Sequence, residues 1–277
     1  VSQLSFNLVN LGSFGNLRLQ SMNLAEPGDD GYNIYVNADE SSVSINGAWP
    51  KLMYDCSANI ACPGSQPVKI ENIPSDEEVI SIANSFLSDH GISKDLYGEP
   101  VVQNDWRIMY DRNPAGAYVP ETITVVYPLQ IQDQTLYDEG GNKSGLNVSI
   151  NVRNKKVISV YDLAVPNFQS SQYDAETDSA KLLKIAEKGG MYGYVQPNAK
   201  KFVDIELGTP KIELVRMWNY KNNQSEELLI PSLIFPITKL PDSDPYFYRN
   251  SVTVPLIKEI LDKDNGNPII TPMMEKQ

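Results

Sequence analysis

The chain has 277 residues, of which 41% are hydrophobic, so it can form a substantial core and is not a disordered polymer. Its formal net charge is −12, with 35 acidic side chains against 23 basic ones. Such a charge argues against nucleic acid or anionic lipid as a partner, because both are themselves negative. No stretch of the sequence approaches the roughly 20 apolar residues that a membrane-spanning helix needs.

The first part of the chain, residues 1–74, is predicted to be a β-rich segment. Residues alternate between apolar and polar, with the period of a strand, at Asn16–Gln20, Tyr32–Val36 and Val43–Ile45. Turn-forming residues at Pro27–Gly31 separate the first two runs. We therefore expect strands joined by short turns before the first helix.

Two cysteines, Cys56 and Cys62, lie in a loop-like stretch of this segment. They are too few for a structural zinc site, and His90 is the only histidine that could join them. A disulfide that closes a short loop fits best, and it implies an oxidising compartment. Two free thiols in a reducing compartment remain the alternative. Since the sequence begins with Val1, we expect a mature or trimmed chain from which a signal peptide or anchor could have been removed.

A helix is predicted to begin after Ser75, because Ser75 and Glu78 have the spacing of a capping box. Apolar residues then recur with the helical period. They are Val79, Ile82, Ala83, Phe86 and Leu87. Gly91 can adopt the left-handed backbone conformation that ends a helix. His90 is therefore expected to end the helix and not to act in catalysis.

Strands are predicted to follow this helix. The alternating run from Ile123 to Ile131 contains Pro128, which cannot donate a ladder hydrogen bond, so this strand should lie at an edge or be bulged. A polar excursion follows at Gln132–Gly145. Leu146–Val152 and Val157–Leu163 then form a predicted hairpin.

The same succession is predicted again after a Ser/Gln-rich linker at Asn167–Ala175. A helix signal at Asp178–Lys188 comes first. Strands are expected at Ile205–Trp218, Leu228–Ile237 and Ser251–Ile257, and Leu256–Leu261 reads as a last strand or a short helix.

Two proline patterns recur in the same order in both parts. Gly98-Glu99-Pro100 matches Gly208-Thr209-Pro210, and Pro128 within its strand matches Pro236. A recurrence in fixed order indicates duplicated supersecondary units. The predicted fold class is therefore α+β: the β segment 1–74, then two tandem units at 75–166 and 176–277. Each unit is expected to pack one helix on an antiparallel meander.

The first of these units resembles the PepSY domain, a cystatin-like helix-on-sheet module. The resemblance rests on the helix start Ser75–Leu87 and on Val148–Val160, above all Val152-Arg-Asn-Lys-Lys-Val157. It covers about residues 75–163, and a weaker similarity extends over residues 177–260. It implies a secreted or envelope-facing module that binds or restrains other proteins, often proteases, with no active-site residues to carry over.

No residue set predicts catalysis, a metal or a cofactor. Tyrosine clusters in loops are the best sequence clue to a partner, because tyrosine buries a large area at low entropic cost. The candidate partner-binding residues are Tyr192, Tyr194, Tyr246, Phe247 and Tyr248. Packing of these rings on their own sheets is the alternative. Asp262-Lys-Asp264-Asn265-Gly266 resembles the start of a calcium loop, but an ordinary solvated turn explains it as well.

The function predicted from sequence is a non-catalytic, extracytoplasmic binding or structural module, secreted or attached to the envelope. Its expected partner is another envelope or secreted protein. The alternative is a hydrolase that acts on glycans through a pair of carboxylates. A flat sheet face with exposed tyrosines would favour binding, and two close carboxylates with a raised pKa would favour hydrolysis.

Overall fold

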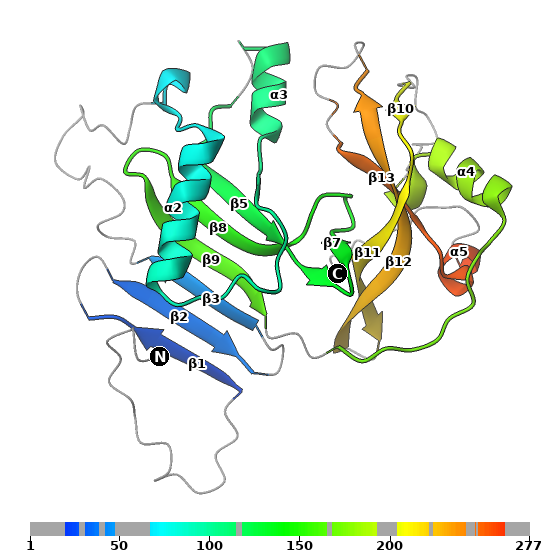
Figure 1. The fold of residues 1–277 in the computed structure, drawn as a ribbon, viewed down its shortest axis with the longest axis horizontal. Helices are drawn as coiled ribbons and strands as arrows, with labels where there is room; N and C mark the ends of the chain where they lie inside the picture. Colours follow the sequence, from blue (N-terminus) through cyan, green and yellow to red (C-terminus); the bar gives the residue numbers. More distant parts are fainter. Residues whose placement is uncertain are drawn as a thin grey trace, which may run out of the picture. The chain divides into compact units, whose positions relative to one another are not determined.

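A computed structural model describes residues 20–27, 31–38, 42–47, 67–114, 118–164, 168–192, 204–221, 224–241, 247 and 249–263. The chain forms two compact units (Figure 1). The first consists of Val1–Leu129 and Gly145–Phe168, and the second of Gln130–Ser144 and Gln169–Gln277. The chain therefore leaves the first unit after Leu129 and returns to it at Gly145.

The described strands of the first unit form one antiparallel sheet in the order β1-β2-β3-β9-β8-β5-β4. Their bounds are β1 Ser21–Ala25, β2 Tyr32–Asn37, β3 Ser42–Gly47, β4 Val101–Val102, β5 Thr122–Pro128, β8 Gly145–Asn151 and β9 Lys156–Ala164. The N-terminal strands join the rest of the sheet through β3, where Ile45 pairs with Val160. One continuous sheet thus contains residues from both ends of the unit.

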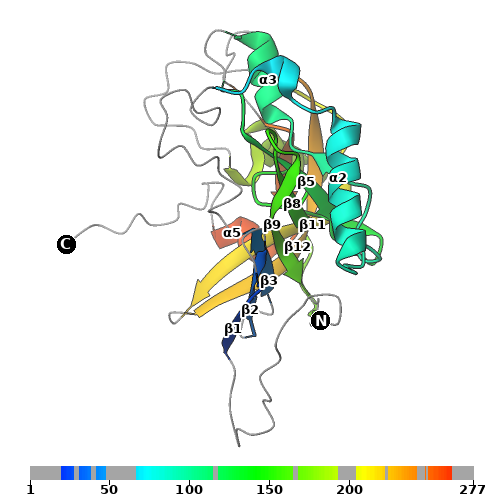
Figure 2. The ribbon, with the colours of Figure 1, turned by 90° about the vertical axis from the view of Figure 1, so that its left-hand side faces the viewer.

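Helix α2, Asp76–Asp89, packs along one face of this sheet, over β5, β8 and β9 (Figure 2). Its buried side chains are Val79, Ala83, Phe86 and Leu87, in agreement with the predicted apolar face. Ser75 caps the helix, since its hydroxyl accepts from the Glu78 N–H at 3.3 Å. The Glu78 carboxylate forms an ion pair with Lys155, with the two charged atoms 2.6 Å apart. Two shorter helices, η3 Ile70–Asn72 and α3 Asp105–Arg112, flank α2 in the chain.

The described strands of the second unit form a mixed sheet in the order β10-β12-β11-β7-β6, and β13 also pairs with β12. The bounds are β6 Gln130–Ile131, β7 Gln134–Tyr137, β10 Glu206–Leu207, β11 Lys211–Lys221, β12 Gln224–Lys239 and β13 Ser251–Pro255. The β7–β11 pair is parallel, and the other pairs are antiparallel. The helices are α4 Ser179–Glu187, η4 Gly190–Tyr192 and α5 Lys258–Lys263.

The predicted fold class, a β segment followed by two tandem helix-plus-meander units, is wrong. Strands hold 43% of the described residues and helices 22%, so the protein is mostly β, with one antiparallel and one mixed sheet. The segment 1–74 does not stand apart, because β3 pairs with β9. The polar excursion Gln132–Gly145 is not a loop of the first unit, because it supplies β7 to the second sheet. The end of the predicted strand Ile123–Ile131 also leaves the first sheet, because Gln130–Ile131 forms β6. These differences come from long-range pairing that local periodicity cannot reveal.

Pro128 is also placed differently from the prediction. It is the last residue of β5, an interior strand between β8 and β4. A missing N–H is tolerated there because the strand ends at that residue. The Pro128 carbonyl still accepts from the Gly98 N–H at 2.8 Å.

Within these two different sheets, the repeated proline patterns have the same register. The Gly98 N–H donates to the Pro128 carbonyl, and the Gly208 N–H donates to the Pro236 carbonyl at 2.7 Å. Directly after the two Gly-x-Pro motifs, Val101 pairs with Val126 and Lys211 with Ile234, each two residues before the strand proline. The two prolines themselves pair with Gly145 and Ser251. The sequence pattern therefore located equivalent backbone positions, although the units around them differ.

The start of α4 gives a prediction on pH. Lys181 donates to the Glu176 carboxylate at 2.8 Å, and the N–H groups of Asp178 and Thr177 donate to it as well. These hydrogen bonds, led by that of Lys181, lower the pKa of Glu176 to about 2. A depressed pKa means that this contribution to stability is complete above the unfolded-state pKa, about 4.3, and is lost as the pH falls toward 2.

An NMR titration of the Glu176 side-chain carboxyl checks this expectation. Lys181→Met should move the midpoint upward, since it removes the largest cause of the shift. A midpoint near 4.3 in the unmodified protein would show that the Glu176–Lys181 contact does not persist in solution.

A buried hydroxyl in β13 gives a second prediction. Thr253 is fully buried, and its Oγ1 has no hydrogen-bond partner within the described part of the chain. Thr253→Val keeps the shape and removes the unsatisfied group, so we expect stability to rise by about 1 kcal/mol. Thr124→Val is the control, because Thr124 Oγ1 has a partner in Ser149 Oγ at 3.1 Å. Urea denaturation measures the free energy of unfolding of both variants. An equal change in the two variants would contradict the prediction.

Candidate binding surface

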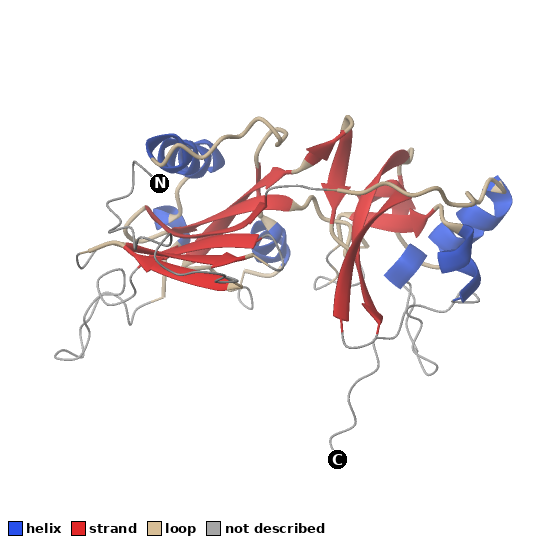
Figure 3. Cartoon of the chain, turned by 90° about the horizontal axis from the view of Figure 1, so that it is seen from below, coloured by secondary structure: helices blue, strands red, loops and turns tan. Residues whose placement is uncertain are grey.

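The first sheet has two chemically different faces. Residues that point toward α2 are apolar and buried, among them Ile34, Ile45, Val148 and Val160. Because side chains alternate along a strand, their neighbours point to the other face. We call this the outer face. It includes nine polar or aromatic residues: Asn33, Tyr35, Ser44, Asn46, Thr124, Asn147, Ser149, Ser159 and Tyr161. Val126, which pairs with Asn147, and Val101, which pairs with Val126, lie on the same face on the side of β4. In Figure 3 α2 lies on one side of the strands, and the outer face is the opposite side.

Cross-strand pairing orders the outer face into a row of hydroxyls and amides. Asn33 pairs with Asn46, Asn46 with Ser159, and Ser159 with Ser149, which in turn pairs with Thr124. The row therefore crosses five strands, from β2 to β5. All five of its side chains are uncharged, and each can donate and accept hydrogen bonds.

Hydrogen bonds hold part of this face in place. Ser149 Oγ lies 3.1 Å from Thr124 Oγ1 and 3.2 Å from the Tyr161 hydroxyl. The Asn147 amide donates to the Asp162 carboxylate at 3.2 Å and to the Gly145 carbonyl at 2.8 Å. Asp162 has a positive φ of 59° where β9 is bulged against β3. The bulge shifts the β9 register beside Tyr161.

Two tyrosines stand on the outer face in neighbouring positions. Tyr35 is 43% exposed and Tyr161 is 39% exposed. Tyr35 lies on β2 and Tyr161 on β9, with β3 between them and Ser44 paired with Tyr35. Two strand spacings put their backbones about 10 Å apart. The ring of Tyr161 is further anchored by its hydroxyl contact with Ser149.

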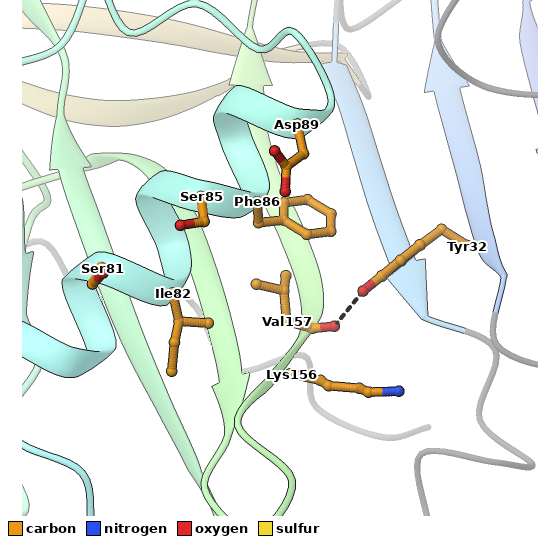
Figure 4. Close-up of a pocket in the computed structure, with 8 residues that line it drawn as sticks. All are labelled: Tyr32, Ser81, Ile82, Ser85, Phe86, Asp89, Lys156 and Val157. Atoms are coloured by element: carbon orange, nitrogen blue, oxygen red, sulfur yellow. Dashed lines mark hydrogen bonds between the residues drawn. The ribbon is translucent and has the colours of Figure 1, made fainter.

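The opposite side of the unit has a hollow of about 440 Å³ beside α2 (Figure 4). Ser81, Ser85 and Asp89 follow one another along the helix, while Ile82 and Phe86 point toward the strand below. Tyr32, Lys156 and Val157 complete the lining, and the Tyr32 hydroxyl donates to the Val157 carbonyl at 2.9 Å. The hollow is open and mixes one carboxylate with one amine, so no single chemistry stands out.

His90 is the C-cap residue of α2, as predicted. Its Nδ1 lies 2.7 Å from the Phe86 carbonyl, and its ring stacks on Phe86 with the centroids 4.0 Å apart. Tyr32 lies edge-on to the same ring at 5.9 Å. These contacts give His90 a structural role at the end of the helix.

Of the tyrosine-loop residues predicted to bind a partner, Tyr194, Tyr246 and Tyr248 lie outside the described residues, as do Cys56 and Cys62. Tyr192 is the last residue of η4, and Phe247 is half-buried. The Cys56–Cys62 disulfide and the partner-binding role of the five loop residues therefore stay predictions. The outer face was not proposed as a site from sequence, although alternation at Tyr32–Val36 and Leu146–Val152 could have identified part of it.

The structure does bring the stems of the two tyrosine loops together. Arg249, which follows one loop, donates from Nη1 to the carbonyl of Gly189, which precedes the other, at 2.8 Å. Gly190 has a positive φ of 71°, and a Cβ there would lie 2.3 Å from the Thr253 carbonyl oxygen. The turn before Tyr192 is therefore fixed against β13. The two clusters are far apart in the sequence, and only the fold shows that the residues flanking them meet.

The described residues offer few groups for catalysis. They contain no cluster of three or more His, Cys, Asp or Glu that could hold a metal ion. Glu176 and Asp262 share the Lys181 amine, at 2.8 and 3.1 Å. The pKa of Glu176 is lowered, chiefly by its hydrogen bond from Lys181, whereas a general acid needs a raised pKa. Asp262 thus has an ion-pair partner, and the rest of the calcium-like sequence, from Asp264 to Gly266, lies outside the described residues.

No helix in the described part of the chain is both long and apolar enough to cross a lipid bilayer. No protein-family model matches the sequence, and neither a curated protein nor a solved structure shows significant similarity to it.

Proposed function

We propose that this protein is a non-catalytic, extracytoplasmic binding module and that it recognises its partner through the outer face of the first sheet. The observation that carries the proposal is the exposure of Tyr35 and Tyr161 on a largely polar sheet face. Tyrosine at such a surface contributes a large contact area and a hydroxyl at low entropic cost.

The side chains around the two rings support recognition. Asn33 and Asn46 are exposed, and they lie in the same row as Ser159 and Ser149. Because α2 covers the other face, a ligand on the outer face does not need to disturb the core. The Thr124–Ser149–Tyr161 hydrogen bonds fix part of the surface before binding, which lowers the entropic cost of association.

Hydrolysis of glycans by a carboxylate pair has less support. The Glu176–Asp262 pair lies at the base of α4, and its carboxylates are held by the Lys181 amine. The hydrogen bond from Lys181 is the largest cause that lowers the pKa of Glu176, whereas the acid in glycoside hydrolysis needs a raised pKa. An extracytoplasmic location and the Cys56–Cys62 disulfide accompany this proposal as predictions from sequence.

The test compares capture by the immobilised protein with capture by Tyr35→Lys/Tyr161→Lys, from the native cell-envelope fraction. Tyr118→Lys is the matched control, because Tyr118 is 72% exposed and lies in the loop between α3 and β5, outside the strands that form the outer face. Mass spectrometry and sugar analysis identify what each variant retains. We expect material that the unmodified protein and the control retain and that the double variant releases.

Two results would contradict the proposal. Identical capture by all three proteins would remove the outer face from the binding site. Release of sugars or peptides from the envelope fraction by the protein, abolished by Glu176→Gln, would establish catalysis in place of simple binding.

A further inference from the structure

We propose that the partner of the outer face is a neutral polysaccharide, which lies across the strands and stacks on Tyr35 and Tyr161. This inference rests on the proposed function, since it names the chemical class of ligand for the same surface. Three properties of the face carry it: its lack of charge, its hydrogen-bonding groups and the placement of the two rings.

The absence of charge is the first property. None of the nine outer-face residues is charged, although 21% of the chain is Asp, Glu, Lys or Arg. The nearest carboxylate in the sequence of β9, that of Asp162, already accepts from the Asn147 amide. A polyanion would find no positive charge among the nine residues, and a polycation would find only the single Asp162 carboxylate beside them. A neutral ligand matches it, because no ionic group has to lose water without gaining a partner.

The hydrogen-bonding groups are the second property. Seven of the nine side chains are amides or aliphatic hydroxyls: Asn33, Ser44, Asn46, Thr124, Asn147, Ser149 and Ser159. Amides and hydroxyls donate and accept, and so do the hydroxyls of a sugar. The backbone groups of the inner strands are used within the sheet, so recognition falls to these side chains. Ser149 is the exception, because it is buried and holds Thr124 and Tyr161 in place.

The two rings are the third property. The face of an aromatic ring is negatively polarised, and the C–H groups on one side of a pyranose carry partial positive charge, so the two stack favourably. Tyr35 and Tyr161 are about 10 Å apart across the strands, roughly the length of a disaccharide within a chain. Ser44, between them on β3, is placed to contact the sugar that bridges the rings.

A protein partner fits this surface less well. The buried centre of a protein interface is normally enriched in apolar and aromatic side chains, with polar groups at the rim. On the outer face the aliphatic residues Val101 and Val126 lie on the side of β4, at the edge of the sheet, and polar groups surround the two tyrosines. A long polar ligand requires no such apolar centre.

The second sheet shows that a polar face is not a requirement of the strand arrangement. Thr124 lies four residues before Pro128, and Ser232 lies four residues before Pro236, in strands of matching register. Ser232 is fully buried, in a strand whose neighbouring same-face residues Ile230 and Ile234 pack with Met191 and Val215. The corresponding face of the second sheet thus forms a core. In the first sheet the equivalent positions hold Thr122, which is exposed, Thr124, which is half-buried, and Val126, which is buried, so this face is more polar there.

The experiment is affinity electrophoresis of the full chain in native gels that contain hydroxyethyl cellulose, laminarin or galactomannan, with polygalacturonate as a charged comparison. The variants are Tyr35→Ala/Tyr161→Ala and the control Tyr118→Ala. We expect retardation by at least one neutral polymer, at least a tenfold weaker affinity for the double variant, and no change for the control. Circular dichroism checks that the variants remain folded. Tyr161→Phe adds a milder probe, since it keeps the ring and removes only the contact with Ser149.

Retardation by none of the three neutral polymers, or only by polygalacturonate, would overturn the inference. Retardation that the double variant retains would also overturn it, because the binding site would then lie elsewhere. If the double lysine variant releases a captured protein while no neutral polymer binds, the polysaccharide inference fails and the proposed binding function stands. If neither effect is seen, both fail.

Discussion

Replacing Gly145 with alanine is expected to destabilise the protein by about 3 kcal/mol or more. Gly145 is buried at the start of β8 and pairs with Pro128. A Cβ at this position would lie 2.1 Å from the Tyr127 carbonyl oxygen and 2.5 Å from the Leu129 nitrogen. Both atoms belong to the backbone, so no side chain can move aside, and the β5–β8 pair has to separate locally. Urea denaturation followed by circular dichroism measures the loss.

Gly140→Ala is the control for this experiment. Gly140 is five residues earlier in the chain, it is exposed, and its nearest neighbours are the side chains of Asn142 and Asp138 at 3.3 Å. These side chains can adjust, so we expect a change below about 1 kcal/mol. A similar loss for the two variants would mean that the close approach at Gly145 is not what limits this position.

Replacing Leu87 with alanine is expected to cost about 3 kcal/mol, because it leaves a cavity between α2 and the first sheet. Leu87 is fully buried and belongs to the cluster that contains Val79, Val148 and Ile150. The sequence identified Leu87 as part of the apolar stripe of this helix. The expected size of the effect follows from the structure, which shows the side chain without any exposed surface.

The matched control is Leu183→Ala in α4. Leu183 is 52% exposed, so the same substitution there removes little buried surface and should change stability by less than about 0.5 kcal/mol. Equal destabilisation by the two variants would argue that α2 does not rest on the sheet through Leu87. Thermal and urea denaturation of both variants, compared at matched conditions, distinguish these outcomes.

Both stability predictions also bear on the outer face. Gly145 begins β8, and Leu87 packs against the apolar side of the same sheet. Asn147 and Ser149 extend from β8 to the outer face, so weaker packing behind that strand should loosen the proposed binding surface. Variants that destabilise the protein should therefore be compared with outer-face variants only at temperatures where all of them are folded.

The sequence by itself determined the local elements with strong periodicity. Ser75, Gly91 and the apolar stripe between them specify α2, since caps and helical spacing act within a few residues. The alternation at Tyr32–Val36 and Leu146–Val152 identifies strands β2 and β8 for the same reason. Gly98-Glu99-Pro100 and Gly208-Thr209-Pro210 even marked positions with the same register, because each Gly N–H reaches a proline carbonyl in the partner strand.

Only the tertiary structure decided which strands pair and therefore what each face presents. The pairing of β3 with β9 joins residues more than a hundred positions apart, and no local pattern encodes such a partner. The same holds for β7, which pairs with β11 within the second unit and turns a predicted loop into part of a sheet. Tyr35 and Tyr161 become neighbours only through the β3–β9 pair. Strand pairing over long sequence distances depends on the whole hydrophobic core, which is why the sequence alone could identify only parts of the candidate site.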